Sequence, residues 1–159
     1  EAIEALNGIV DIFLPDFKYI SSEMAARYSN APDYPEVAKR ALAQMVKQTG
    51  DAKFDEREMM KQGVIVRHLI LPGHIKESKK AIRYLYETYG DQIYISIMNQ
   101  YTPMPGIEKR FKNLGRTITQ REYDEVVDYA VDLGVENGFI QEGETAKESF
   151  IPQFDDTGL

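Results

Sequence analysis

Three short apolar segments of the sequence are each followed by residues that could contact a ligand, most of them polar. Residues 9–14 precede Asp16 and Lys18, residues 64–71 precede Pro72, Gly73 and His74, and residues 93–98 precede Asn99, Gln100, Tyr101 and Thr102. The segments are rich in Ile, Val and Leu and alternate with helical patterns, which is typical of parallel strands in βα units. Because ligands bind beyond the carboxyl ends of such strands, the sequence predicts a ligand site there.

Lys18 and Asp16 each fit more than one role. A desolvated lysine at a strand end can form a Schiff base with a carbonyl substrate or hold an anionic group such as a carboxylate. Lys18 could equally be a solvated loop residue. Asp16 could cap the short helix that follows Ser21 or Ser22, or bind an amine or a cation. Residue type alone leaves these alternatives open.

Arg67 and His68 lie inside an apolar segment, and strand alternation predicts that they point to opposite faces. A long Arg in such a segment needs a partner such as a carboxylate, so Arg67 is either a site residue or half of an ion pair under the sheet. His68 and His74 do not have the spacing of metal ligands. Neither a GxGxxG nor a Walker phosphate-binding sequence occurs.

The intervening segments predict helices. One begins at Asp33 and ends near Gly50, and a second ends at Gly90. A third has a capping box, Thr119 with Glu122, and ends at Gly134. Residues 51–62 are polar and predict a loop with a helical turn, while residues 138–143 and 150–159 predict a hairpin or an extended tail. Residues 2–6 look like the last turns of a helix. This favours a piece of a longer βα protein over a short leading helix with a processed start.

Composition narrows the function classes. The 159 residues are 43% hydrophobic and 28% charged, which excludes disordered and collagen-like chains. A net charge of -7 disfavours nucleic acid and anionic membranes as partners. No apolar run is long enough for a spanning helix, so we expect a cytoplasmic protein. The chain contains no Cys, which excludes disulfides, cysteine nucleophiles and thiolate-bound zinc or iron–sulfur clusters within it.

Three segments together resemble one enzyme family. They are residues 10–18 (VDIFLPDFK), 64–73 (VIVRHLILPG) and 95–102 (ISIMNQYT). They are similar to the last three barrel strands of radical S-adenosylmethionine (SAM) enzymes, and most similar to the pyruvate formate-lyase activating enzymes and their less characterised homologues. Residues 148–155 also look like the tail of the less characterised branch. Gln100, Tyr101 and Thr102 stand where activating enzymes often have a His.

The resemblance implies an α/β fold that is the C-terminal half of a partial (β/α)6 TIM-like barrel, with about three parallel strands. Residues 1–105 would be the βα units and residues 106–159 a C-terminal helix and extended tail. It implies that SAM is bound by Asp16, Lys18, Arg67, Gln100 and Tyr101, and that the full-length protein carries a 4Fe-4S cluster whose cysteines lie outside this chain. The implied activity is reductive cleavage of SAM to a 5′-deoxyadenosyl radical, with this chain alone inactive.

Partners follow from the same resemblance. The implied partners are a glycyl radical enzyme as the activated substrate and a flavodoxin or ferredoxin as the electron donor. Half a barrel leaves an unpaired edge strand, so we also expect a homo-oligomer through that edge. Two alternatives remain open, which are a Schiff-base lyase or aldolase that uses Lys18 and a non-catalytic α/β interaction module.

Overall fold

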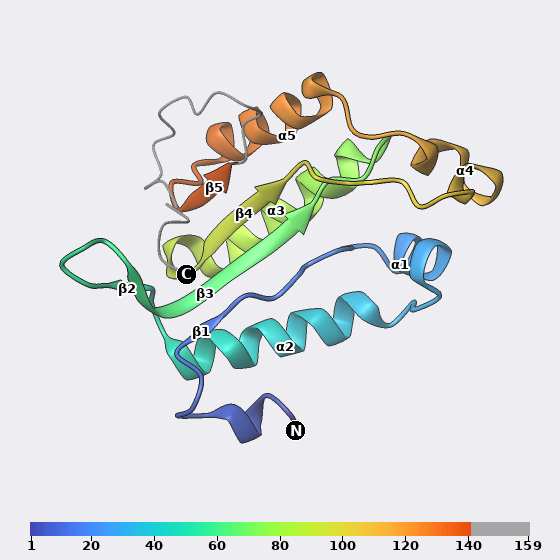
Figure 1. Ribbon diagram of the computed structural model, residues 1–159. Helices are drawn as coiled ribbons and strands as arrows, with labels where there is room; N and C mark the ends of the chain where they lie inside the picture. The colour runs from blue at the N-terminus through green and yellow to red at the C-terminus, as the bar shows by residue number, and fades with distance from the viewer. Residues whose placement is uncertain (141–159) are drawn as a thin grey trace.

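The computed structural model describes residues 1–140 and shows a mixed α/β fold built on a five-stranded sheet (Figure 1). The strands are β1 (Ile12–Phe13), β2 (Lys53–Phe54), β3 (Met60–Leu69), β4 (Tyr94–Met98) and β5 (Gly138–Ile140). Four of them are parallel in the order β1-β3-β4-β5, and β2 pairs antiparallel with β3. The arrangement is consistent with a partial barrel-like α/β fold.

Five α-helices connect these strands within the described residues. They are α1 (Ser22–Ser29), α2 (Tyr34–Thr49), α3 (Ile75–Tyr89), α4 (Ile107–Arg110) and α5 (Gln120–Leu133). Three short 3-10 helices are η1 (Glu4–Leu6), η2 (Gly90–Gln92) and η3 (Lys112–Gly115). In place of the predicted last turns of a helix, residues 4–6 form only the single turn η1. The capping box predicted at Thr119 is present, with reciprocal hydrogen bonds between Thr119 and Glu122.

One face of the sheet forms the hydrophobic core against the long helices. Val64 and Val66 of β3 and Ile95 of β4 are almost completely buried there, together with Leu42 of α2 and Leu85 of α3. In Figure 1, α3 lies behind β3 and β4. The alternate residues of each strand lie on the opposite face, where Ile65 and Tyr94 are buried but Arg67, nearer the carboxyl end of β3, is exposed. We call this the open face, and polar side chains can gather at its carboxyl end.

The prediction for residues 51–62 was wrong. The segment contains β2 and the beginning of β3, which starts at Met60 rather than at Val64. A turn stabilised by the Asp55 carboxylate, which accepts the N–H groups of Arg57 and Met59, connects the two strands. Gly63, at φ +141°, allows the chain to pass closely, since a Cβ there would lie 2.9 Å from the Cα of Ala52.

The first strand is shorter than residues 9–14 at both ends, and Pro15 interrupts it on the C-terminal side. Only Ile12 and Phe13 pair continuously with β3, and an isolated parallel bridge between Asp16 and Arg67 follows. Proline has no N–H to donate, but its carbonyl still accepts from the Arg67 N–H at 2.8 Å. Residues 138–140 form β5, which pairs in parallel with β4. The rest of the predicted tail lies outside the described residues.

Candidate functional site

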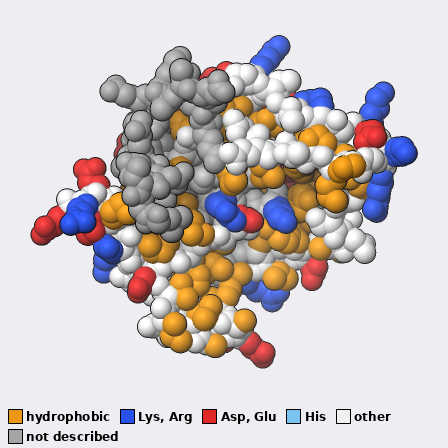
Figure 2. All heavy atoms as spheres, in the orientation of Figure 1, with side chains coloured by type: hydrophobic (Ala, Val, Ile, Leu, Met, Phe, Trp, Pro, Cys, Tyr) orange, Lys and Arg blue, Asp and Glu red, His pale blue; other side chains and the backbone are white. Residues whose placement is uncertain are grey.

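Asp16 and Arg67 form an ion pair at the carboxyl ends of β1 and β3. The Arg67 Nε donates to Asp16 Oδ1 at 2.8 Å. The Arg67 side chain is 44% exposed and the Asp16 side chain 45% exposed. The prediction that Arg67 needs a carboxylate partner is confirmed. The pair lies on the open face of the sheet, half in solvent, rather than buried under it. Figure 2 shows basic and acidic side chains side by side near the centre of the face in view.

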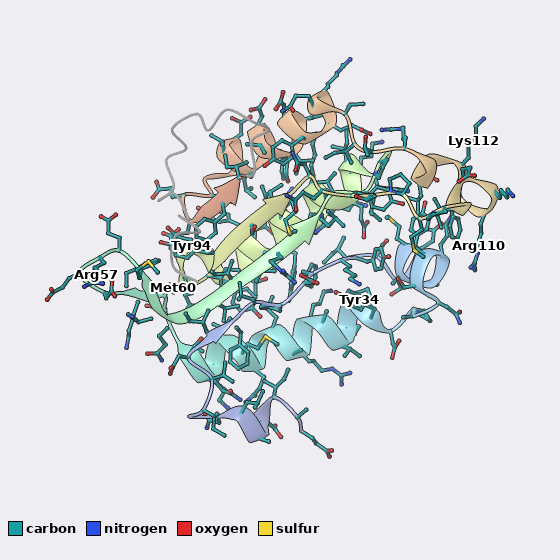
Figure 3. The ribbon with its side chains drawn as sticks, viewed as in Figure 1. Tyr34, Arg57, Met60, Tyr94, Arg110 and Lys112 are labelled. Atoms are coloured by element: carbon teal, nitrogen blue, oxygen red, sulfur yellow. The ribbon has the colours of Figure 1, made fainter. Side chains whose placement is uncertain are left out.

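Asp16, Arg67 and Ser96 form a row across the open face, which we call the polar row. Two aromatic rings, of Tyr94 and Phe139, lie beside it. Arg67 is in register with Ser96 of β4, which is in register with Phe139 of β5, so these residues share the open face. Tyr94, two residues before Ser96, stacks on Phe139 at a centroid distance of 5.3 Å. Figure 3 labels Tyr94 toward the opposite end of the sheet from α4. A ligand on the polar row would therefore have apolar ring surface on one side.

Lys18 is placed beside this row by the extended backbone that follows β1. Phe17 is buried, whereas Asp16 and Lys18 on either side of it are exposed, as strand alternation requires. Tyr34, at the start of α2 (Figure 3), donates its hydroxyl hydrogen to the Asp16 carbonyl and accepts from the Lys18 N–H, both at 3.0 Å. Burial raises the pKa of Tyr34, so the phenol stays protonated at neutral pH and can make both contacts.

The buried His68 contacts the segment after β1 from the helix-covered side of the sheet. His68 Nδ1 lies 2.7 Å from the Phe17 carbonyl, and its Nε2 lies 2.8 Å from Ser78 Oγ on α3. Since a carbonyl can only accept, Nδ1 must carry the proton and Nε2 must accept from the Ser78 hydroxyl. Burial lowers the pKa of His68, which keeps the ring neutral and this pattern of donors fixed.

We expect this histidine to make folding stability depend on pH. The unfolded chain binds a proton near pH 6.5 whereas the folded chain does so at a lower pH, so stability is lost as pH falls below about 6.5. Relative to His68→Gln, which cannot titrate there, the wild type should lose up to about 1.4 kcal/mol of unfolding free energy per pH unit. Urea unfolding of both proteins between about pH 7.5 and 5.5 measures this difference, and parallel pH profiles would contradict it. His74 titrates in both proteins and cancels.

Glu77, in the first turn of α3, stabilises the turn that follows Lys18. Its Oε1 accepts from the N–H groups of Ile20 and Ser21 at 2.8 and 2.7 Å, and the residue is 8% exposed. Ser21 in turn caps α1, since its hydroxyl accepts from the Met24 N–H. The suggestion that Asp16 caps this helix was therefore wrong. Together His68, Glu77 and Tyr34 fix residues 16–21 in one conformation.

Gln100 and Tyr101 follow β4 but are not brought into contact with the Asp16–Arg67 pair among the described residues. Gln100 is exposed, and Tyr101 donates its hydroxyl hydrogen to the Leu114 carbonyl at 2.9 Å. Burial raises the pKa of Tyr101. Its hydroxyl therefore holds the loop between β4 and α5 rather than facing the polar row. Whether either residue contacts SAM stays a prediction.

The sequence did not single out a second polar cluster at the same edge. Tyr28 of α1 lies 2.6 Å from His74 Nε2, and the Asn113 amide lies 3.1 Å from the Tyr28 hydroxyl and 3.0 Å from the same imidazole nitrogen. Burial and the charge of Arg27 lower the pKa of His74. The Pro-Gly turn before His74, at a strand end, indicated a possible site residue. Its partners Tyr28 and Asn113 lie 46 and 39 residues away in the sequence, so no local pattern pointed to them.

Comparisons with known proteins add one relative. No protein-family model matches the chain. It is 25% identical over 130 residues to an uncharacterized protein of Methanocaldococcus jannaschii, MJ0674, in a match that covers 82% of this chain. The chain spans 34% of the length of that relative.

The described part of the chain contains neither a cluster of metal ligands nor a membrane-spanning helix. In residues 1–140, no three His, Asp or Glu side chains come together as a metal site would need. Within the same range, no helix combines the length and apolar composition needed to cross a bilayer.

Proposed function

We propose that this chain supplies the methionine-binding half of a radical SAM enzyme of the pyruvate formate-lyase activating type. The observation that supports it is the placement of Asp16, Lys18 and Arg67 on one open face at the carboxyl ends of β1 and β3. SAM carries an amino acid zwitterion, which needs cations near its carboxylate and an anion or carbonyls near its amine. One carboxylate beside two cationic groups matches that requirement.

The residues fit the methionine end in a specific way. Arg67 presents donors in a planar fork, and Nε is already occupied by Asp16, which orients the guanidinium. Lys18 makes no ion pair among residues 1–140, so its ammonium is available for a ligand carboxylate. In the proposed complex, Lys18 and Arg67 hold the carboxylate and Asp16 faces the amine.

The radical chemistry belongs to the cofactors. With a 4Fe-4S cluster, SAM supplies a 5′-deoxyadenosyl radical, and the protein positions these groups and excludes water. The chain has no Cys, so in the full-length protein the cluster would be bound by residues outside this sequence. The proposed partners are a glycyl radical enzyme as substrate and a flavodoxin or ferredoxin as electron donor.

The edge of the sheet is suited to further strands. β1 is the outer strand of the parallel order, and beside it a groove of about 240 Å³ runs along α2. The groove is lined mainly by apolar side chains, among them Val37, Ala41 and Met45. In the proposed full-length protein this edge would carry the preceding barrel strands, and in the separate chain it would pair with a second copy.

No observation in the described residues favours the lyase alternative. A Schiff-base lysine needs a site that removes the amine from water, and within residues 1–140 Lys18 is exposed. A non-catalytic module remains the second candidate, because the chain alone binds no cluster through thiolates.

A binding measurement on the chain itself tests the proposed site. We expect SAM to shift the amide resonances of Asp16, Lys18 and Arg67 in a ¹⁵N-labelled sample, weakly, because only part of the site is present. Decarboxylated SAM, which lacks the group that Lys18 and Arg67 would bind, should cause much smaller shifts at these positions. Equal shifts with both compounds, or shifts confined to α5, would show that the polar row is not the methionine site.

A further inference from the structure

A cluster of unpaired cations lies where α1 and the loop between β4 and α5 meet. The cluster consists of Arg27, Lys109, Arg110 and Lys112, and we call it the cationic end. Residues 99–119 carry four basic residues and one acidic residue, although the whole chain has a net charge of -7. All four members of the cationic end are exposed, and none forms an ion pair within residues 1–140. The distribution of charge is therefore strongly uneven.

The geometry of the cationic end is built around an aromatic ring. The guanidinium of Arg27 lies 5.9 Å from the centroid of Phe111, and that of Arg110 lies 5.1 Å from it. Arg27 also lies 5.4 Å from the ring of Tyr28, which contacts Phe111 edge-on. Cation–π contacts use the ring face and leave the N–H donors of each guanidinium free for an anion. Two arginines far apart in sequence thus share one ring and present unused donors.

The surface surrounding these residues fits a protein partner. Figure 2 shows Lys and Arg side chains gathered around an apolar patch at the end of the molecule where Figure 1 places α4. Arg110 and Lys112 are labelled at this end in Figure 3. The loop also exposes Met104, at 72% the most exposed large apolar side chain described. Arginine and exposed apolar groups together are typical of protein interfaces.

The charge pattern discriminates between classes of anionic partner. A nucleic acid that extended along α5 would meet a groove in which four carboxylates, those of Asp124, Glu125, Asp128 and Asp132, outnumber the two cations Lys79 and Arg121. A short acidic segment matches four cations without reaching that region. We propose that the cationic end binds an acidic segment of a partner protein, with carboxylates on Arg27, Arg110 and Lys112 and an apolar side chain against the exposed Met104 of the same loop.

The position of this surface connects it with the candidate site. Tyr28 bridges the cationic end to His74, which directly follows the carboxyl end of β3. A partner bound here would lie at the edge of the sheet where the polar row ends. The inference does not depend on SAM binding, because its residues are separate from Asp16, Lys18 and Arg67.

Fluorescence anisotropy with a labelled dodecapeptide of Asp and Glu around a central Phe tests the proposal on the 159-residue chain. We expect saturable binding that is largely lost at about 0.5 M salt, because screening removes exposed charge pairs. Arg110→Glu with Lys112→Glu should weaken binding by about tenfold or more. The control, Lys47→Glu with Lys53→Glu, reverses two exposed unpaired lysines elsewhere and should change affinity less than about twofold.

Two further probes decide the class of partner. A single-stranded oligonucleotide and anionic phosphatidylserine vesicles should bind more weakly than the acidic peptide. Tighter binding of either probe through Arg110 and Lys112 would overturn the assignment of a protein partner. Equal loss of peptide binding in both charge-reversal pairs would overturn the location, since it would reflect net charge only.

Discussion

Replacement of Glu122 by alanine is expected to lower the free energy of unfolding by about 3 kcal/mol. Glu122 accepts from the Gly73 N–H at 2.9 Å and from the Thr119 N–H at 2.8 Å, and both its oxygens bind Arg116 at 2.7–2.8 Å. It therefore connects the loop after β3, the loop after β4 and the first turn of α5. The Arg116 hydrogen bonds chiefly hold the pKa of this carboxyl well below its usual range.

Glu125 provides the matched control for this substitution. It lies on the same helix three residues later, is exposed, and forms one ion pair, with Lys79 at 2.8 Å. Glu125→Ala should lower the free energy of unfolding by less than about 1 kcal/mol. Urea unfolding at neutral pH measures both variants. A loss at Glu122 no greater than that at Glu125 would show that the Glu122 contacts do not hold the two loops together.

Lys18→Ala is expected to have the largest effect on cofactor binding in the full-length protein. In a site that the remainder of the proposed full-length protein shields from water, a charge-assisted contact between the Lys18 ammonium and the methionine carboxylate is worth about 1.5–3 kcal/mol, which corresponds to roughly 10- to 150-fold in Kd for SAM. Cluster content should be unchanged. Lys18→Arg should not restore binding, since a planar guanidinium differs from an ammonium in shape and reach. Asp16→Asn should have a smaller effect, because in the proposal it only orients the amine.

A control variant separates this contact from general charge effects. Lys80 of α3 is exposed and unpaired within residues 1–140, so Lys80→Ala removes the same charge away from the proposed site. Its Kd for SAM should stay within about twofold of that of the wild type. Equal Kd values for Lys18→Ala and the wild type would make Lys18 a solvated loop residue.

The parallel sheet was predictable from the sequence because residues 63–66 of β3 and residues 94 and 95 of β4 are buried on both faces, which requires continuous apolar runs. β3 and β4 appear as apolar runs, and the core helices have an apolar stripe that ends at glycine. The β2 hairpin was not predictable, because residues 53 and 54 are exposed and pair only through contacts with β3. For β1, Pro15 is a local signal for the C-terminal end of the strand, since proline cannot donate to the ladder, whereas nothing local marks its start at Ile12.

The candidate site was predictable in part for a similar reason. Asp16, Lys18 and Arg67 lie near strand ends, and strand alternation places side chains on a face without knowledge of tertiary contacts. The residues that support them could not be inferred, since Glu77 looks like an ordinary first-turn acid and its partners lie 56 and 57 residues away. Tyr28, His74 and Asn113 also come from three separate elements. Such clusters are determined by packing and leave no periodic signal.

The most direct test of the proposed function is the formation of 5′-deoxyadenosine by the full-length protein. The protein would be reconstituted anaerobically with iron and sulfide, reduced with dithionite and incubated with SAM, and the products quantified by liquid chromatography. We predict 5′-deoxyadenosine and methionine from the wild type and from Lys80→Ala, and a strong reduction at subsaturating SAM for Lys18→Ala. No 5′-deoxyadenosine from a wild-type protein that contains its cluster would contradict the proposal that this chain is half of a radical SAM enzyme.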